Sequence, residues 1–101
     1  MTPEGRVKAK VKDYLRARGA YWFMPVQNGM GSPSLDFLVC YQGRFIGIET
    51  KTGTKGMTPR QDLTAGAMRE AGALTITVNE SASVTEQLDR LFGCFPSRGP
   101  V

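Results

Sequence analysis

The feature that most constrains the fold is a pair of short apolar segments separated by two residues. Residues 37–41 and 44–51 have the composition of strands, and Gln42-Gly43 between them is typical of a hairpin turn. Apolar side chains occur on both faces of this hairpin: Phe37, Val39, Ile46 and Ile48 on one face, and Leu38, Cys40 and Phe45 on the other. We therefore expect the hairpin to lie in a sheet that helices cover on both sides.

Further helices and strands are predicted around the hairpin. Thr2-Pro3-Glu4 is typical of a helix start, and Gly19 is suited to the end of that helix. Thr58-Pro59 indicates the start of a second helix that ends near residue 71. We expect strands at residues 21–24 and 74–78 and a last helix over residues 83–92. The pattern predicts a single α/β (α+β) domain over residues 1–92 and a loose C-terminal tail over residues 93–101.

The composition narrows the possible chemistry. The chain has no histidine, which excludes histidine-activated nucleophiles, histidine-ligated metal nucleases and Cys–His zinc sites. Any catalysis must therefore use carboxylates, lysine, tyrosine, hydroxyl groups or a bound hard cation. The 13 basic residues against 9 acidic ones are compatible with a polyanionic partner. Without a secretory signal or a long apolar stretch, we expect no membrane association and a cytoplasmic location.

The hairpin also brings ionisable residues together. A two-residue turn sets a register in which Asp36 lies opposite Glu49, and Lys51 shares a face with Glu49 because strand side chains alternate. Two facing carboxylates repel each other, so either Lys51 or a divalent cation should compensate. Mg²⁺ and Mn²⁺ bind carboxylate oxygens and promote phosphodiester hydrolysis, and a neighbouring lysine can stabilise the developing charge.

Other interpretations of these residues stay open at this point. The cluster is also explained as solvated charges at a strand end, and a bulge would change the register. Glu4 falls on the helical face of Val7 and Val11, so we expect it to point toward the core side, although acids are common in first turns. Gln61 follows Thr58 by three residues, and a helix-capping box explains it as well as an active-site role does.

An ordered set of motifs resembles the virus-type replication-repair nuclease (VRR-NUC) domain of the PD-(D/E)XK superfamily. The motifs are, in order, Glu4, Gln27-Asn28-Gly29 with Gly31, Asp36, Ile48-Glu49-Thr50-Lys51 and Pro59-Arg60-Gln61. The resemblance spans residues 4–78. Glu-x-Lys alone is a weak motif, whereas the whole set with its spacing is fairly specific. One departure is Leu35, which stands where the family usually has a proline before the aspartate.

The resemblance implies an α-β-β-β-α-β core with a mixed central sheet, and Mg²⁺- or Mn²⁺-dependent hydrolysis of phosphodiester bonds in DNA. By motif position it implies that Asp36, Glu49 and the main-chain carbonyl of Thr50 are metal ligands. It also implies that Lys51 is the catalytic lysine, that Glu4 is a supporting acid and that Gln61 is an active-site polar residue. Stand-alone family members, often viral, are similar to Holliday-junction resolvases. This similarity implies a branched DNA substrate, a homodimer, and a location in the cytoplasm of a bacterial or virus-infected cell.

The predicted DNA contacts are Asn28, Lys55 and Arg60. Lys55 and Arg60 flank the predicted site, whereas we interpret most cations of the first helix as a solvated face. Two other functions fit the same sequence. A non-catalytic DNA-binding module with a nuclease-like fold would not need the cation, and a small basic protein–protein adaptor would show no salt-sensitive affinity for DNA.

Overall fold

The computed structural model describes residues 1–26 and 32–95. Within these residues, three helices and four strands follow one another along the chain: α1 (Pro3–Arg18), β1 (Tyr21–Phe23), β2 (Phe37–Tyr41), β3 (Arg44–Thr50), α2 (Pro59–Glu70), β4 (Leu74–Val78) and α3 (Val84–Phe92). The predicted helices and strands are all present, and their ends lie close to the predicted ones.

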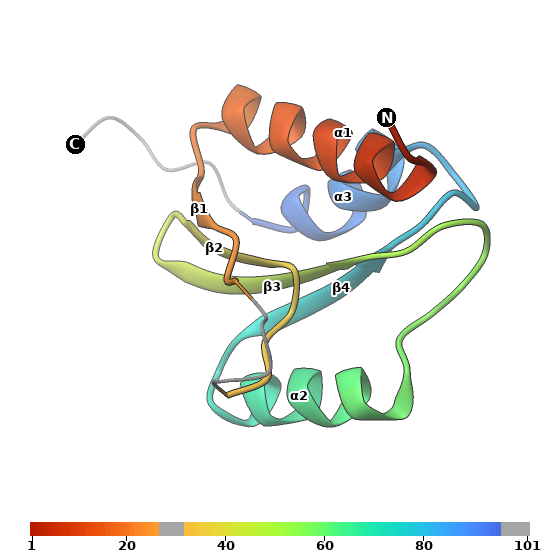
Figure 1. Ribbon diagram of the computed structural model, residues 1–101. Helices are drawn as coiled ribbons and strands as arrows, with labels where there is room; N and C mark the ends of the chain where they lie inside the picture. Colours follow the sequence, from red (N-terminus) through yellow and green to blue (C-terminus); the bar gives the residue numbers. More distant parts are fainter. Residues whose placement is uncertain (27–31, 96–101) are drawn as a thin grey trace.

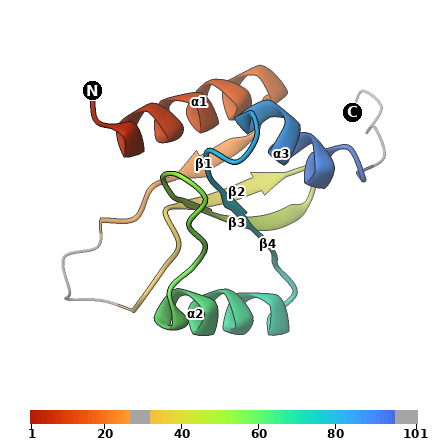
Figure 2. The same cartoon turned by 90° about the vertical axis from the view of Figure 1, so that its right-hand side faces the viewer.

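The strands form one mixed sheet in the order β1-β2-β3-β4. The β1–β2 and β2–β3 pairs are antiparallel, whereas β3 and β4 are parallel. A parallel pair needs a crossover connection, and α2 supplies it. Helices α1 and α3 lie on one face of the sheet and α2 lies on the other (Figures 1 and 2). The predicted fold class is confirmed.

The β2–β3 hairpin has the predicted register. Pairing runs from Tyr41 opposite Arg44 to Phe37 opposite Ile48. Gln42 has a φ of 49° and Gly43 a φ of 77°. A two-residue hairpin turn of type I′ requires positive φ at both central residues, and the twist of such a turn suits the flanking strands. The turn therefore sets the alignment of the two strands as far as their other ends.

The main core lies between the sheet and the pair α1 and α3. The apolar side chains of the hairpin that face this core are fully buried: Phe37, Val39, Ile46 and Ile48. They belong to one cluster with Val11 and Leu15 of α1 and with Leu88 and Phe92 of α3. Burying each such side chain contributes roughly 1.5–3 kcal/mol, so this face supplies most of the stabilising burial.

The opposite face of the sheet is covered only in part. A Cβ on Gly47 would lie 2.6 Å from Met68 Cε and 2.9 Å from Leu35 Cδ1, so the missing side chain lets α2 pack closely against β3. Cys40 is exposed, however, and Phe45 is 48% exposed. The prediction that helices cover both faces of the hairpin was therefore wrong at these positions, because α2 packs chiefly against β4 and reaches β3 at Gly47.

The chain just after α3 returns to the hairpin turn. The ring of Phe95 packs against Phe92 and Tyr41, and the guanidinium of Arg44 lies 4.3 Å from the centre of the Phe95 ring. Residues 96–101 of the predicted tail lie outside the described residues, and the division of the chain at residue 92 stays a prediction. Among the helices described here, none has the length and apolar character needed to cross a membrane.

Candidate active site

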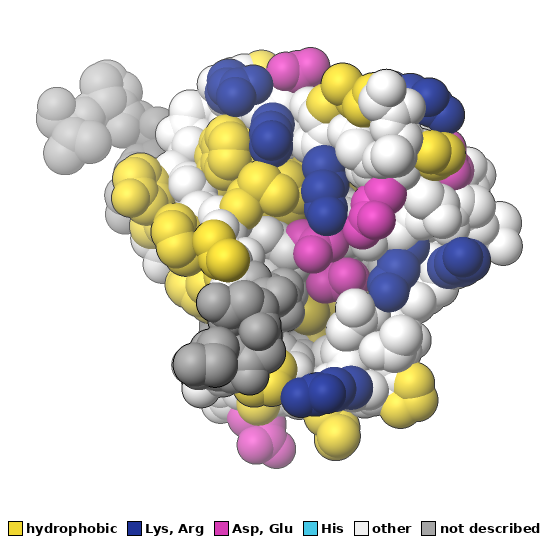
Figure 3. Space-filling model, viewed as in Figure 1, with side chains coloured by type: hydrophobic (Ala, Val, Ile, Leu, Met, Phe, Trp, Pro, Cys, Tyr) yellow, Lys and Arg dark blue, Asp and Glu magenta, His cyan; other side chains and the backbone are white. Residues whose placement is uncertain are grey.

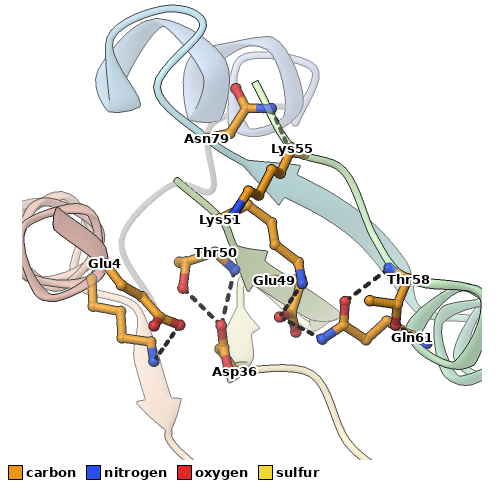
Figure 4. Close-up of polar contacts among 10 residues, drawn as sticks. Glu4, Asp36, Glu49, Thr50, Lys51, Lys55, Thr58, Gln61 and Asn79 are labelled. Carbon is orange, nitrogen blue, oxygen red and sulfur yellow. Dashed lines mark hydrogen bonds and ion pairs between the residues drawn. The ribbon is translucent and has the colours of Figure 1, made fainter. Parts of the chain in front are cut away.

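The candidate active site lies where β2 begins and β3 ends. Asp36 directly precedes β2, Glu49 and Thr50 are the last residues of β3, and Lys51 follows them. The hairpin pairing ends at Phe37 opposite Ile48, and the same register continued by one position places Asp36 opposite Glu49. Figure 4 shows Asp36, Glu49 and Lys51 near one another at this end of the hairpin. The structure thus brings together the three residues around which the sequence-based hypothesis was built.

Thr50 orients the carboxylate of Asp36. The Thr50 main-chain N–H donates to Asp36 Oδ2 over 3.0 Å, and the Thr50 hydroxyl donates to the same oxygen over 2.7 Å. Hydrogen bonds to an ionised acceptor are stronger than neutral ones, so this pair of donors holds the Asp36 carboxylate in one orientation. The donor residue is itself buried in the sheet, opposite Val78 of β4.

Glu49 is a buried carboxylate with one oxygen left without a partner. Its side chain is only 5% exposed, and Oε2 lies 3.9 Å from Lys51 Nζ. Its other oxygen, Oε1, is buried and has no hydrogen-bond partner in the described part of the chain. Burial, together with the negative charge of Asp36, raises the pKa of Glu49 to about 7, although the charge of Lys51 acts in the opposite direction. An unpartnered buried carboxylate oxygen costs free energy, which a bound cation would offset.

The oxygen atoms at this end of the hairpin fit a hard divalent cation. Two carboxylates and a main-chain carbonyl are the ligands that Mg²⁺ accepts while it keeps several water molecules. Among the described residues, no group of three or more Asp, Glu, Cys or His side chains is arranged so that it could hold a metal ion. The site therefore suits a cation held by two carboxylates, with main-chain, water or substrate oxygens completing its coordination.

Gln61 is both a helix cap and a neighbour of the site. The Gln61 side-chain Oε1 accepts a hydrogen bond from the Thr58 main-chain N–H over 3.0 Å. The Gln61 main-chain N–H donates to Thr58 Oγ1 over 3.2 Å, which completes the capping box. Its Nε2 donates to Glu49 Oε2 over 3.1 Å. The capping box holds the side-chain amide of Gln61 in place, and the N–H of that side-chain amide in turn holds the Glu49 carboxylate. The two interpretations that the sequence left open are therefore both realised by one side chain.

Glu4 lies at the edge of the site. Its side chain is 55% exposed, and its Oε1 is 3.3 Å from Lys8 Nζ. The expectation that Glu4 points toward the core side was wrong, because the buried stripe of α1 begins only at Val7. Figure 4 shows its carboxylate on the α1 flank, facing the Asp36 and Thr50 side of the site.

The predicted DNA contacts differ in their surroundings. Lys55 and Arg60 are both exposed, and Arg60 belongs to the first turn of α2. Asn28 lies outside the described residues, as do Gln27, Gly29 and Gly31 of the same motif.

Sequence reasoning missed two residues that hold the loop carrying Lys55. Asn79 Nδ2 donates to the Lys55 carbonyl over 2.9 Å. Glu80 Oε1 accepts from the Gly53 N–H over 2.8 Å, and the Glu80 N–H donates to the Gly53 carbonyl over the same distance. Both residues are more than twenty positions away along the chain. No local sequence signal marks such contacts, because they depend on the pairing of β3 with β4.

Comparison with known proteins adds one result to this geometry. The sequence matches no family model and no curated protein. The fold, however, is similar to a solved structure described as a VRR_NUC domain, with a TM-score of 0.75 and 26% sequence identity over 95% of this chain and 100% of that one. This similarity supports assignment of the chain to the VRR-NUC family. The VRR-NUC assignment supports a nuclease-family function and agrees with the motifs found in the sequence.

The one departure from the VRR-NUC motif has a structural explanation. Leu35 is fully buried, and its side chain lies beside Gly47. It contributes to the packing of α2 against the sheet, whereas the neighbouring Asp36 bonds to Thr50. The replacement of proline by leucine therefore changes packing behind the site and not the polar groups within it.

The double role of Gln61 can be tested at the cap. Thr58→Ala should lower the free energy of unfolding by about 1 kcal/mol, because the N-cap hydroxyl is lost. It should also shift the NMR signals of the Gln61 side-chain amide, because the cap no longer holds that amide against Glu49. Ser83→Ala is the matched control, since Ser83 caps α3 through the Glu86 N–H. It should cost a similar amount and leave the Gln61 signals in place. Equal effects of the two variants on those signals would refute the link between cap and site.

Proposed function

We propose that this protein is a Mg²⁺- or Mn²⁺-dependent endonuclease that hydrolyses phosphodiester bonds in DNA, with a preference for branched DNA such as Holliday junctions. The observation that carries the proposal is the buried Glu49 carboxylate, which lies beside Asp36 and Lys51 and whose Oε1 has no hydrogen-bond partner within residues 1–26 and 32–95. The VRR-NUC assignment supports nuclease chemistry, and the set of oxygen ligands supports a hard cation.

Each residue of the site has a distinct part in this mechanism. Asp36, Glu49 and the main-chain carbonyl of Thr50 would hold the cation. When bound, such a cation polarises the scissile phosphate and lowers the pKa of a water molecule. Lys51, at the same end of the hairpin, would hold the attacking water or stabilise the negative charge that develops on the phosphate oxygens. Gln61 keeps Glu49 in position through its 3.1 Å hydrogen bond.

Charged groups around the site would contact the DNA backbone. Lys55 and Arg60 are exposed and follow the site residue Lys51 within ten positions of the chain, and we propose both, together with Asn28, as DNA contacts. Glu4 would act as a supporting acid whose charge is partly balanced by Lys8. Because phosphate contacts release counterions, the affinity for DNA should fall steeply as the salt concentration rises.

We also propose that the protein is a homodimer. Two sites related by a two-fold axis would meet the two strands of opposite polarity that a four-way junction presents. Exposed apolar side chains at Tyr21, Phe23 and Phe45 offer a contact surface.

Light scattering at tens of micromolar should therefore report a dimer. A monomer that still cleaves junctions would contradict this part of the proposal.

The role of the lysine separates catalysis from metal binding. Lys51→Ala should reduce cleavage by about 10²–10³-fold, because one electrostatic stabiliser of the transition state is lost. The variant should still bind Mn²⁺, since the three oxygen ligands remain. Lys10→Ala is the control, because it removes the same charge from α1 and should leave cleavage unchanged. Parental activity in Lys51→Ala would mean that the lysine only balances the charge of Glu49.

The metal site can be tested through stability. Asp36→Asn keeps an oxygen that can accept from Thr50, and it removes one of two facing charges, so the metal-free variant should be at least as stable as the parent protein. Mn²⁺ should raise the melting temperature of the parent, because the cation binds only the folded state, but should do little for this variant. The variant should also fail to cleave DNA.

The control for this experiment is Asp13→Asn, an exposed acid of α1, which should respond to Mn²⁺ as the parent does. Parallel melting shifts in the parent and in Asp36→Asn would exclude the two-carboxylate site. A protein that binds DNA equally well with and without the cation, and never cleaves it, would instead be the non-catalytic module.

A further inference from the structure

The net positive charge of the protein is concentrated in α1. This helix of 16 residues contains six basic and two acidic residues, so it accounts for the whole net charge of +4. The remaining residues of the chain carry seven basic and seven acidic side chains. A polyanion is therefore attracted chiefly to α1.

The buried stripe of α1 separates two rows of these cations. Residues four apart lie above one another on a helix, which places Lys8, Lys12 and Arg16 in one row. Arg6 and Lys10 form a second row on the other flank, where they line a hollow of about 200 Å³ together with residues of the turn between β4 and α3. The two rows consequently face different surroundings.

The row of Lys8, Lys12 and Arg16, here called the α1 ridge, leads away from the candidate active site. At its near end, Lys8 pairs with Glu4, which faces the site in Figure 4. At its far end, the Arg16 guanidinium lies 5.6 Å from the centre of the Trp22 ring of β1. Figure 3 shows basic side chains on the α1 side of a central group of acidic side chains. The ridge and the acidic site are thus parts of one continuous face.

The cations of the α1 ridge can exchange their present partners for phosphates. Arg16 pairs with Asp13 over 3.3 Å, but the two side chains are 62% and 80% exposed, and ion pairs of this kind contribute little stability. Lys12 takes part in none of the ion pairs found within residues 1–26 and 32–95. Arg18, by contrast, is engaged at 2.8 Å with Asp89 of α3 and is not part of the ridge.

We propose that the α1 ridge binds the sugar–phosphate backbone of a duplex DNA arm that leads away from the scissile phosphate. This inference rests on the proposed nuclease function, and it states where one duplex arm of the DNA substrate lies on the protein surface. From Glu4 to Arg16 the helix rises about 18 Å, at 1.5 Å per residue. At one charge per 3.4 Å on each strand, this length corresponds to about five base pairs.

Two matched double variants test the path. Lys12→Gln with Arg16→Gln removes two charges from the ridge, and Arg6→Gln with Lys10→Gln removes two charges, also four residues apart, from the opposite flank. Binding to a labelled duplex of about 20 base pairs is measured over a series of salt concentrations, with EDTA to prevent cleavage. The ridge variant should lose affinity on the order of tenfold, and its log–log salt dependence should become shallower by about 2, because each lost phosphate contact removes roughly one unit.

The opposite-flank variant should keep the salt dependence of the parent and lose at most about twofold in affinity, because only the long-range field changes. In cleavage assays with Mn²⁺, the ridge variant should be impaired on junctions with long arms. The defect should become smaller when each arm is shorter than about five base pairs, since such an arm does not reach Arg16. Equal losses in the two double variants, or a defect of undiminished size on short arms, would overturn the proposal.

DNA binding by the α1 ridge and DNA cleavage at the site can be tested separately. Binding in EDTA does not depend on hydrolysis, so a protein that shows the ridge effect and never cuts DNA would refute the nuclease and keep the ridge. A protein that cuts DNA with parental efficiency in the ridge variant, on long arms as well as short ones, would refute the ridge alone.

Discussion

The alignment of β2 with β3 is the constraint on which both the core and the site depend. Side chains alternate along a strand, so a shift of one residue would turn the buried face of one strand toward solvent. In the observed register, Phe37 faces Ile48 and both are fully buried. One position further from the turn, the same register places Asp36 opposite Glu49. The apolar pairs thereby provide the stabilisation that holds two carboxylates near each other despite their repulsion.

The polar groups of the site are held by contacts that also belong to secondary structure. Thr50 binds Asp36 while it forms the last step of the β3–β4 ladder. Gln61 binds Glu49 while it completes the N-terminal cap of α2. Stiffening of this kind matters for electrostatic stabilisation, because groups that are already in place need not reorganise during a reaction. Unlike these polar contacts, the packing of α2 on Gly47 depends on the absence of a side chain.

Local sequence signals predicted a large share of this arrangement. The turn at Gln42-Gly43 was sufficient to derive the register of the hairpin, and Thr2 and Thr58 marked the starts of two helices. The same reasoning failed where coverage by another segment decides the outcome. Cys40 lies in an apolar run and is nevertheless exposed, because α2 does not extend over it. Glu4 has the helical phase of buried residues, yet it lies in a first turn that precedes the buried stripe.

The sequence by itself determined the order of the elements, the hairpin register and the gathering of Asp36, Glu49 and Lys51, because these follow from turn chemistry and the period of side chains along a strand. Only the tertiary structure decided that Glu49 is buried with one oxygen unpartnered among the residues that the structure describes, and that Asn79 and Glu80 hold the loop of Lys55. It also decided that one row of cations on α1 leads to the site. Burial and long-range hydrogen bonds depend on which distant segments pack together, and the spacing of residues along the chain does not contain that information.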